Sequence, residues 1–315
     1  MRVLMLSAGE VERLLDAEAL LDALAEEFRA LSAGEVVAPG RGEVAAGDAG
    51  FLLTMPVYRT GRDITVKMVS VFHGNEAAGA PTHQALICLF DGATGTPRCI
   101  MDGAYITAMR TAGASALTIR ALAREDARTL AIIGAGTQGA AHLKLAPLAH
   151  DCQEMRIASQ QFQRAERLAA SDDRARAVPS IEEAVRGADV VCLCTSAATP
   201  VIHADWLSPG AHVTSVGYRP PGGELDAVTI ERGHLFVETR HAFAAPPVGC
   251  GELAGRDPES GTEIGELLLG RRPGRMSSDE ITVYKAMGHA CEDMAAASLV
   301  YRRAQEQGVG VFVTL

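Results

Sequence analysis

A glycine motif that begins at residue 134 limits the possible folds of this chain more than any other segment. The apolar, strand-like run LAII (130–133) leads into Gly134-x-Gly136-x-x-Gly139 and then into a segment compatible with a helix. In such a strand–turn–helix unit the first glycine permits a tight turn, the second lets the backbone approach a pyrophosphate, and the third allows close packing of helix on strand. The motif therefore predicts a dinucleotide-binding domain that begins only after a long N-terminal region.

Downstream of the motif, strand-like and helix-like segments alternate, which predicts a Rossmann-type doubly wound parallel sheet. The expected strands are EMRIAS, ARAV, DVVCLCTS, AHVTSVG and HLFVET, and the expected helices are QRAERLAA and SIEEAV. Further on, DEITVYKAMGHACEDMAAASLVYRRAQEQ predicts one long helix with Gly288 inside it. Because this helix is too long and too apolar for a tail, we expect it to return to the N-terminal region.

The region before the motif has a different pattern. Ser7 and Glu10 form a capping box, and apolar residues then recur at helical spacing, so we expect the chain to open with helices. Four β-rich runs follow, FLLTMPVY, ITVKMVSVF, HQALICLF and PRCIMDG, and DGATG predicts a hairpin turn between the last two. A proline-free segment that starts at Tyr105 predicts a helix leading into the glycine motif.

These patterns together predict an α/β protein in which one domain is inserted in the other. The Rossmann-type doubly wound parallel sheet would occupy residues 118–287. It would be inserted in a discontinuous α+β domain made of residues 1–117 and 288–315.

Composition and charge argue against several classes of protein. The formal net charge of −10 disfavours nucleic acid or an anionic membrane as a partner, because both need a basic surface. No apolar run reaches the roughly 18 residues of a membrane helix, and the first residues lack a signal-peptide core, so we expect a cytoplasmic protein. The seven cysteines, an odd number without C-x-x-C spacing, predict reduced thiols, and we expect no metal site.

The second strand of the dinucleotide-binding unit bears on the choice of coenzyme. An acid at the end of this strand would bind a free 2′-hydroxyl, but this chain has Ser159, Gln160 and Gln161 there. Ser159 and Gln160 are able to hydrogen-bond a 2′-phosphate, and Arg164 is close enough in sequence to reach it. We therefore expect NAD(P)H as the cofactor, with NADPH favoured over NADH.

A lysine in the run ITVKMVSVF is a candidate for chemistry. Alternation along a strand places Lys67 on the same apolar side as Val69 and Val71. A desolvated ammonium loses its proton more easily, and a carboxylate ligand restores the charge, so such a lysine is suited to hold a substrate acid and to transfer a proton. The alternative is an edge-strand lysine that discourages aggregation.

Other candidates also have structural alternatives. Arg41, in APGRGEV, and Arg110, amid small and mostly apolar residues, are suited to bidentate carboxylate binding, but each could also be a surface cation. His83 would either face the cofactor or be a satisfied structural histidine. Glu224 and Asp226, in GGELDAV, are interpreted as a turn and a helix cap and not as acid–base catalysts.

Six segments occur in a specific order along nearly the whole chain. They are VKMVSVF, PTHQALICLFDGATGTPRCIMDGAYITAMRTAGASAL, IIGAGTQ, SVGYRPPGGELD, EIGELLLGRRPGR and DEITVYKAMGHACEDMAAA. In this order they closely resemble the ornithine cyclodeaminase/mu-crystallin family, which also includes archaeal-type alanine dehydrogenases and ketimine reductases. The resemblance implies that the discontinuous domain binds substrate and forms a homodimer, and that the active site lies between it and the nucleotide domain.

The resemblance also implies roles for individual residues. Arg41, Lys67 and Arg110 would bind the carboxylate of a small amino or imino acid, and Lys67 would lie beside the reacting carbon–nitrogen centre. The remaining matched positions would line the cofactor: Thr82, His83, Thr111, Gly134, Gly136, Thr137, Gln138, Gly139, Ser159, Gln160, Thr195 and Val216.

The loop after the fifth strand distinguishes branches of this family. Cyclodeaminases resemble VGGD there, and the aspartate helps to activate the distal amine of the substrate, whereas this chain has Val216-Gly217-Tyr218-Arg219. Neither tyrosine nor arginine can act as that carboxylate base. We therefore expect an NAD(P)H-dependent oxidoreductase that reduces an imino, ketimine or 2-oxo acid to an amino acid. The alternatives are an ornithine or lysine cyclodeaminase with catalytic NAD, and a non-catalytic, mu-crystallin-like binder of NADPH or a small ligand.

Overall fold

The computed structural model describes residues 2–219, 222–246 and 248–314. The chain folds into two compact units. Unit 1 comprises Met1–Arg110 and His289–Leu315, and unit 2 comprises Thr111–Gly288. The boundary falls within helix α3 (Ala104–Leu122), whereas the prediction from sequence divides this helix later, after residue 117.

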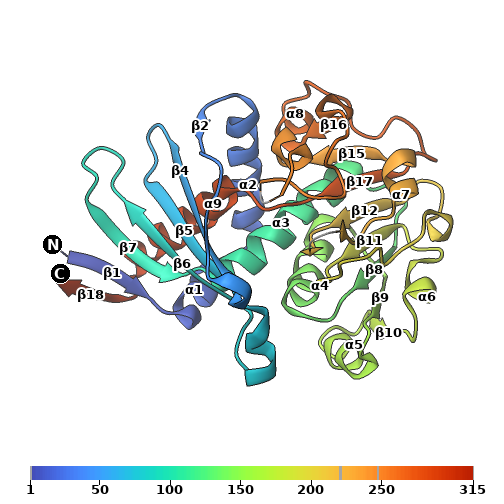
Figure 1. Ribbon diagram of the computed structural model, residues 1–315, viewed down its shortest axis with the longest axis horizontal. Helices are drawn as coiled ribbons and strands as arrows, with labels where there is room; N and C mark the ends of the chain where they lie inside the picture. The colour runs from blue at the N-terminus through green and yellow to red at the C-terminus, as the bar shows by residue number, and fades with distance from the viewer. Residues whose placement is uncertain (1, 220–221, 247, 315) are drawn as a thin grey trace. The chain divides into compact units, whose positions relative to one another are not determined.

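Unit 1 is built on an eight-stranded sheet with the order β18-β1-β7-β6-β5-β4-β2, and β3 also pairs with β4 (Figure 1). Its strands are β1 (Arg2–Leu6), β2 (Val36–Val37), β3 (Gly42–Ala45), β4 (Phe51–Arg59), β5 (Ile64–Val71), β6 (His83–Phe90), β7 (Pro97–Asp102) and β18 (Val311–Thr314), with short helices η1 (Gly47–Ala49) and η2 (His73–Ala78). The four β-rich runs correspond to β4 to β7. The predicted hairpin is confirmed, because β6 and β7 pair antiparallel.

Helices α1 (Ala8–Leu14) and α9 (Ala290–Gln307) pack on this sheet, and α2 (Ala17–Ser32) packs on α9. The predicted capping box of Ser7 and Glu10 is confirmed at the start of α1. The apolar residues of α2 recur at helical spacing and are fully buried, and each such burial stabilises the fold by about 1.5–3 kcal/mol. They are Leu20, Leu21, Leu24 and Phe28.

The prediction that the chain opens with helices is wrong, because β1 precedes α1. β1 pairs in parallel with β7 and antiparallel with β18, where Arg2 lies opposite Thr314. Both partners lie far away in sequence, and β1 does not show a regular alternation of buried and exposed residues. Long-range pairing therefore makes this segment a strand, and the local sequence pattern does not predict it.

Unit 2 contains the predicted Rossmann-type sheet, whose strands pair in parallel in the order β10-β9-β8-β11-β12-β17-β15-β16 (Figure 1). The strands are β8 (Thr129–Ile133), β9 (Glu154–Ala158), β10 (Ala175–Ala177), β11 (Val190–Leu193), β12 (His212–Ser215), β15 (His234–Val237), β16 (Gly261–Glu263) and β17 (Thr282–Lys285). The chain moves outward from β8 through β9 and β10, and then returns to β11 on the other side. This reversal places the topological switch point between β8 and β11, where such folds bind ligands at the carboxyl ends of the strands.

Helices cover both faces of this sheet, so its strands are apolar on both sides. In β8, Leu130 and Ile132 belong to one buried core, and Ala131 and Ile133 belong to a second core across the sheet. Besides α3, the elements around the sheet are α4 (Thr137–Ala149), α5 (Phe162–Ala169), α6 (Ile181–Val185), α7 (Ala227–Arg232), α8 (Ile264–Leu268), η3 (Ala204–Trp206), η4 (Arg240–Phe243), η5 (Pro258–Ser260), and the small ladder of β13 (Tyr218–Arg219) with β14 (Gly222–Gly223).

The predicted single helix near the C-terminus is wrong. Its first part is strand β17, which pairs in parallel with β12 and β15, and only the second part is a helix, α9. Gly288 lies between the two elements with a φ of +76°, a left-handed conformation that favours glycine. The β-branched and aromatic run ITVY suits a buried strand better than a helix. The expected return to the N-terminal region is confirmed, because α9 packs on α2, β4 and β5 within unit 1.

Candidate functional site

Lys67 lies in β5, between β4 and β6 and away from the edge of the sheet. Its side chain faces the same side as Val69 and Val71, as predicted, and the residue is only 1% exposed. Its Nζ atom lies 2.9 Å from each carboxylate oxygen of Asp293. Burial lowers the pKa of Lys67 to about 8, although the charge of Asp293 opposes this shift. The edge-strand alternative is therefore wrong for this lysine.

Arg110, in α3, belongs to the same group of buried charges. The residue is 5% exposed, so the alternative of a surface cation is wrong. Its Nη1 atom lies 2.9 Å from Oε2 of Glu292, and its Nε atom lies 3.3 Å from Oδ1 of Asp293. Lys67, Arg110, Glu292 and Asp293 thus form a buried cluster of two cations and two carboxylates, which we call the α9 ion cluster. Pairing is necessary because an isolated buried charge would be strongly destabilising.

The carboxylates of the α9 ion cluster were not identified in the sequence. Asp293 is 226 positions from Lys67, and Glu292 is 182 positions from Arg110, so spacing gives no hint of the contacts. Both acids lie in the first turn of α9, where the positive end of the helix dipole favours negative charge. The local signal was available, because Glu292 and Asp293 interrupt an otherwise apolar run, ACEDMAAA.

Three other predicted residues also lie in unit 1. Arg41 is partly buried in the loop between β2 and β3. Thr82 directly precedes β6, and its hydroxyl lies 3.1 Å from Nδ1 of the exposed His83, the first residue of that strand. The roles of Arg41, Thr82 and His83 in substrate or cofactor binding stay predictions.

The glycine motif of unit 2 has the geometry that its sequence predicts. Gly134 has a φ of +111°, and a Cβ atom there would lie 2.5 Å from the carbonyl oxygen of Cys194. A Cβ atom at Gly139 would lie 1.9 Å from the carbonyl oxygen of Gly134, so this glycine allows α4 to pack closely on β8. At Gly136, the N-cap of α4, an added Cβ would meet no atom within 4 Å. Packing within the protein does not require this glycine, and the open position suits the approach of a pyrophosphate to the helix N-terminus.

The other predicted cofactor residues of unit 2 follow its strands. Ser159 and Gln160 come directly after β9, Thr195 follows β11, and Val216 follows β12. The carboxyl ends of these parallel strands meet at the same edge of the sheet as the glycine motif. The remaining residues lie on helices: Thr111 is buried in α3, Thr137 and Gln138 start α4, and Arg164 is exposed on α5. Their contacts with a cofactor stay predictions.

The interpretation of GGELDAV is correct for one acid and wrong for the other. Asp226 caps α7, because its side chain accepts a hydrogen bond from the backbone N–H of Thr229 at 2.7 Å. Glu224 is neither a surface turn residue nor a cap, because it is fully buried and accepts hydrogen bonds from the loops after β11 and β12. The close approach of those loops could not be read from the sequence around Glu224.

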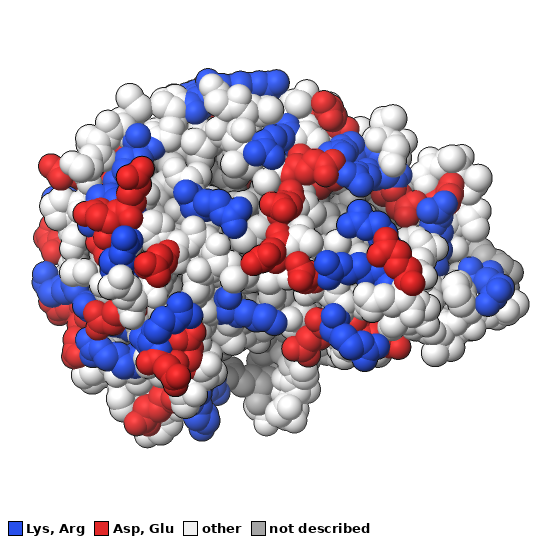
Figure 2. Space-filling view, turned by 180° about the vertical axis from the view of Figure 1, so that it is seen from behind, with Lys and Arg blue, Asp and Glu red and all other residues white. Residues whose placement is uncertain are grey.

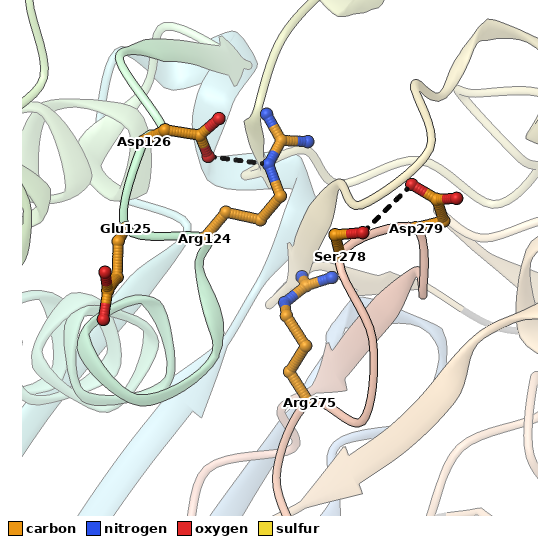
Figure 3. A pocket seen from close by; sticks show the side chains of 6 residues that line it. All are labelled: Arg124, Glu125, Asp126, Arg275, Ser278 and Asp279. Carbon is orange, nitrogen blue, oxygen red and sulfur yellow. Dashed lines mark hydrogen bonds and ion pairs between the residues drawn. The ribbon is translucent and has the colours of Figure 1, made fainter.

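A surface pocket lies elsewhere in unit 2 (Figure 3). It is lined by Arg124, Glu125, Asp126, Arg275, Ser278 and Asp279. These residues precede β8 or β17 and so lie at the amino edge of the sheet, opposite the glycine motif. Arg124 is paired with Asp126 and Asp189, and Arg275 donates to backbone carbonyls and to Thr282. Since its arginines hold the fold together, this pocket is a poor candidate for the functional site.

The distribution of charged side chains, possible metal ligands and cysteines completes the description of the molecule. Basic and acidic side chains are interspersed on the face shown in Figure 2. In the part of the chain that the structure describes, no helix is long and apolar enough to cross a membrane, and no cluster of His, Cys, Asp and Glu could hold a metal. The seven cysteines are free thiols.

Comparison with known proteins identifies the family. The sequence profile of the ornithine cyclodeaminase/mu-crystallin family matches residues 1–308. The chain belongs to this family. The resemblance found in the six sequence segments is thereby confirmed.

Similar members of the ornithine cyclodeaminase/mu-crystallin family match over nearly the whole chain. Ketimine reductase mu-crystallin of Mus musculus is 36% identical over 304 residues, which are 94% of this chain and 96% of the relative. The structure of Thermococcus litoralis Delta(1)-pyrroline-2-carboxylate reductase in complex with NADH and L-proline is 30% identical, with a TM-score of 0.91 and coverage of 98% and 99%. An archaeal alanine dehydrogenase dimer with bound NAD is 29% identical, with a TM-score of 0.90 and full coverage of both chains.

Proposed function

We propose that this family member is an NAD(P)H-dependent oxidoreductase that reduces an imino, ketimine or 2-oxo acid to an amino acid. The observation that carries the proposal is the α9 ion cluster, which buries a lysine and an arginine in a chain with an intact dinucleotide motif. Relatives named ketimine reductase and pyrroline-2-carboxylate reductase support the reaction class.

The cations of the α9 ion cluster are suited to an anionic substrate. Arg110 would bind the substrate carboxylate through its guanidinium fork, and Arg41 would complete this clamp. Asp293 and Glu292 hold Lys67 and Arg110 in place, because each carboxylate lies within 2.9 Å of its cation. Such prior positioning lowers the entropy cost of placing the reacting carbon.

Reduction of a carbon–nitrogen double bond adds a hydride to carbon and a proton to nitrogen. The nicotinamide supplies the hydride when it is bound. Lys67 would supply the proton to nitrogen, since its pKa of about 8 leaves it charged at neutral pH and more acidic than an ordinary lysine. Without an imine nitrogen, the same ammonium would polarise the carbonyl of a 2-oxo acid.

The coenzyme would bind at the carboxyl edge of the unit 2 sheet. Gly134, Gly136 and Gly139 would hold the pyrophosphate, and Ser159 and Gln160, which replace an acid after β9, favour NADPH over NADH. Arg164 would add a charge for the 2′-phosphate. Titration with both coenzymes would test this preference, and tighter binding of NADH would contradict it.

We also propose that the protein is a homodimer that uses the face of the unit 1 sheet opposite its helices. Ile64, Val66 and Met68 of β5 point to that face, and Leu86 of β6 is 50% exposed. An apolar sheet face of this kind is typical of an interface, and a similar alanine dehydrogenase is a dimer. Leu86→Glu should therefore give a monomer in sedimentation, whereas Val228→Glu, at an exposed apolar residue of α7, should not. A wild-type monomer at micromolar concentration would contradict the proposal.

The direct test of the reaction is oxidation of NADPH and NADH, followed at the nicotinamide absorbance. Cyclic ketimines and 2-oxo acids with ammonia or amines would form the substrate panel. We expect consumption with at least one member of the panel. No consumption, combined with ammonia release from ornithine or lysine, would show a cyclodeaminase. Coenzyme binding without either reaction would show a non-catalytic binder.

A further inference from the structure

A second group of buried charges lies in unit 2 and has no role in the reaction proposed above. Its centre is Glu224, whose side chain accepts four hydrogen bonds. Oε1 accepts from the backbone N–H of Thr195 at 2.5 Å and from the hydroxyl of Thr195 at 2.7 Å. Oε2 accepts from the hydroxyl of Ser215 at 2.9 Å and from the backbone N–H of Gly217 at 2.7 Å. One carboxylate therefore joins the loop after β11 to the loop after β12.

Lys285, the last residue of β17, completes this group. Its Nζ atom lies 2.6 Å from Oε2 of Glu252, 2.7 Å from the carbonyl oxygen of Gly217 and 3.1 Å from the hydroxyl of Ser215. Glu252 in turn accepts from the backbone N–H of Leu225 at 2.9 Å. We call Glu224, Ser215, Lys285 and Glu252 the carboxyl-edge cluster, because it connects segments that follow the carboxyl ends of β11, β12 and β17.

Close packing around Glu224 leaves no room for a side chain at three nearby glycines. A Cβ atom at Gly217 would lie 1.8 Å from the carbonyl oxygen of Thr195, and one at Gly223 would lie 2.2 Å from the carboxyl carbon of Glu252. At Gly222 an added Cβ would lie 2.5 Å from the carbonyl oxygen of Ala198. The motif Gly222-Gly223-Glu224 is therefore a docking segment that fixes two strand-end loops.

A carboxylate suits this position better than any other side chain. All four groups that Glu224 contacts are N–H or O–H donors, and a carboxylate presents acceptors only. Burial raises the pKa of the Glu224 carboxyl, while Lys285 and the donors from Thr195 and Gly217 lower it. A glutamine of nearly the same shape would turn one acceptor into a donor and so place it against another donor.

We infer that Glu224 is a positioning residue for the dinucleotide, acting through the loops that carry Thr195 and Val216. This inference rests on the cofactor site proposed above. The loop after β11 starts at the topological switch point, and the Gly134 turn packs against it at Cys194. Glu224 fixes this loop and the loop after β12 relative to each other, before any ligand arrives.

The test is Glu224→Gln, with Asp189→Asn as the matched control. Asp189 is also a carboxylate that accepts backbone N–H bonds, from Arg128 and Thr129 at 2.8 and 3.0 Å, but it lies at the amino edge of the same sheet. Fluorescence titration would give the Kd for NADPH and NADH. We expect Glu224→Gln to raise the Kd about tenfold, the size expected from one lost hydrogen bond to a charged group. Asp189→Asn should leave the Kd within about twofold of wild type.

Amide hydrogen exchange of the ligand-free protein supplies a readout that does not depend on the cofactor. The amides of Thr195 and Gly217 should exchange faster in Glu224→Gln than in wild type, and at the wild-type rate in Asp189→Asn. If Glu224→Gln does not fold, Ser215→Ala replaces it, since this variant removes one donor to Glu224 and should raise the Kd about threefold.

The possible results separate two failures. A wild-type protein that binds neither coenzyme would overturn the proposed function, and the positioning role with it. A wild-type protein that binds coenzyme, together with variants of unchanged Kd or with an equal loss in Asp189→Asn, would overturn the positioning role alone.

Discussion

The two units each bury a lysine at a strand in contact with carboxylates, but the contacts of the two lysines differ in kind. In the α9 ion cluster, Lys67 is paired with the side chain of Asp293, which Arg110 also contacts. In the carboxyl-edge cluster, Lys285 also donates to the carbonyl oxygen of Gly217 and to the hydroxyl of Ser215. Lys285 binds the backbone and so fixes two segments of the fold, whereas Asp293 holds Lys67 in position for the role proposed above. Burial alone therefore does not identify a catalytic lysine.

Replacement of each lysine should separate the two roles, and the largest expected effect is on turnover. Lys67→Ala should lower kcat/KM about 10²- to 10⁴-fold, the usual contribution of a positioned proton donor, and should leave the Kd of the coenzyme unchanged. Steady-state kinetics and coenzyme titration would measure both. Lys144→Ala, at an exposed lysine of α4, is the control and should retain turnover. Near-normal turnover of Lys67→Ala would exclude the proposed role.

The second effect is on stability. Lys285→Met should lower the free energy of unfolding by about 3–5 kcal/mol, because it leaves Glu252 buried without its cation. Lys67→Met should cost less, since Arg110 still faces Asp293. Urea unfolding of the two variants would measure the difference. An equal loss of unfolding free energy in the two variants would contradict the stronger structural role assigned to Lys285.

The third effect is on the pH dependence of activity, which tests the protonation state of Lys67. The pKa of Lys67 is lowered to about 8 by burial, and the charge of Asp293 holds it above a still lower value. Activity that needs protonated Lys67 should therefore fall as pH rises through about 8. In Asp293→Asn this fall should occur at lower pH, because the opposing charge is gone. Glu292→Gln, which removes the partner of Arg110, should move the profile less. A profile that does not move in Asp293→Asn would contradict this coupling.

The fourth effect concerns acid stability and belongs to unit 2. Burial lowers the pKa of His142 to about 4 and that of His212 to about 3. Both imidazoles are therefore neutral in the folded protein, while an unfolded chain takes up protons below pH 6.5. Their contribution to stability is complete above pH 6.5 and is lost at about 1.4 kcal/mol per pH unit for each histidine, as the pH falls towards 4 for His142 and towards 3 for His212.

Urea unfolding at pH 7 and pH 5 would measure this loss. His142→Gln should reduce the pH dependence by about half, since one of the two histidines is removed. His203→Gln is the matched control, because this side chain is 66% exposed, and it should leave the dependence unchanged. The same pH dependence in wild type and His142→Gln would contradict the assignment.

Features that depend on residues close together in the sequence were predictable. The glycine motif, the alternating segments of unit 2 and the apolar side of Lys67 all follow from periodicity or short spacing. The missed elements depend on distant partners. β1 is a strand because it pairs with β7 and β18, and β17 is a strand because it lies between β12 and β15.

The same division holds within the candidate sites. Lys67 could be proposed from its own strand, but Asp293 and Glu292 could not be assigned to it, since they come from the other end of the chain. Glu224 looked like a turn residue because the loops that surround it approach only in the folded sheet. The neighbouring glycines, Gly222 and Gly223, were visible in the sequence. The contacts with Ala198 and Glu252 that require glycine there exist only in the folded protein.

The pairing of β1 with β18 has a consequence for synthesis on the ribosome. Translation delivers unit 2 as one continuous stretch, so its sheet is complete before α9 and β18 have been made. The sheet of unit 1 cannot be completed until β18 has been made, and α9 does not cover the apolar faces of β4 and β5 before then. Domains generally fold as units during synthesis, and exposed apolar strands aggregate. A released chain truncated after Gly288 should therefore contain a protected unit 2 and an N-terminal segment that is open to proteases and chaperones.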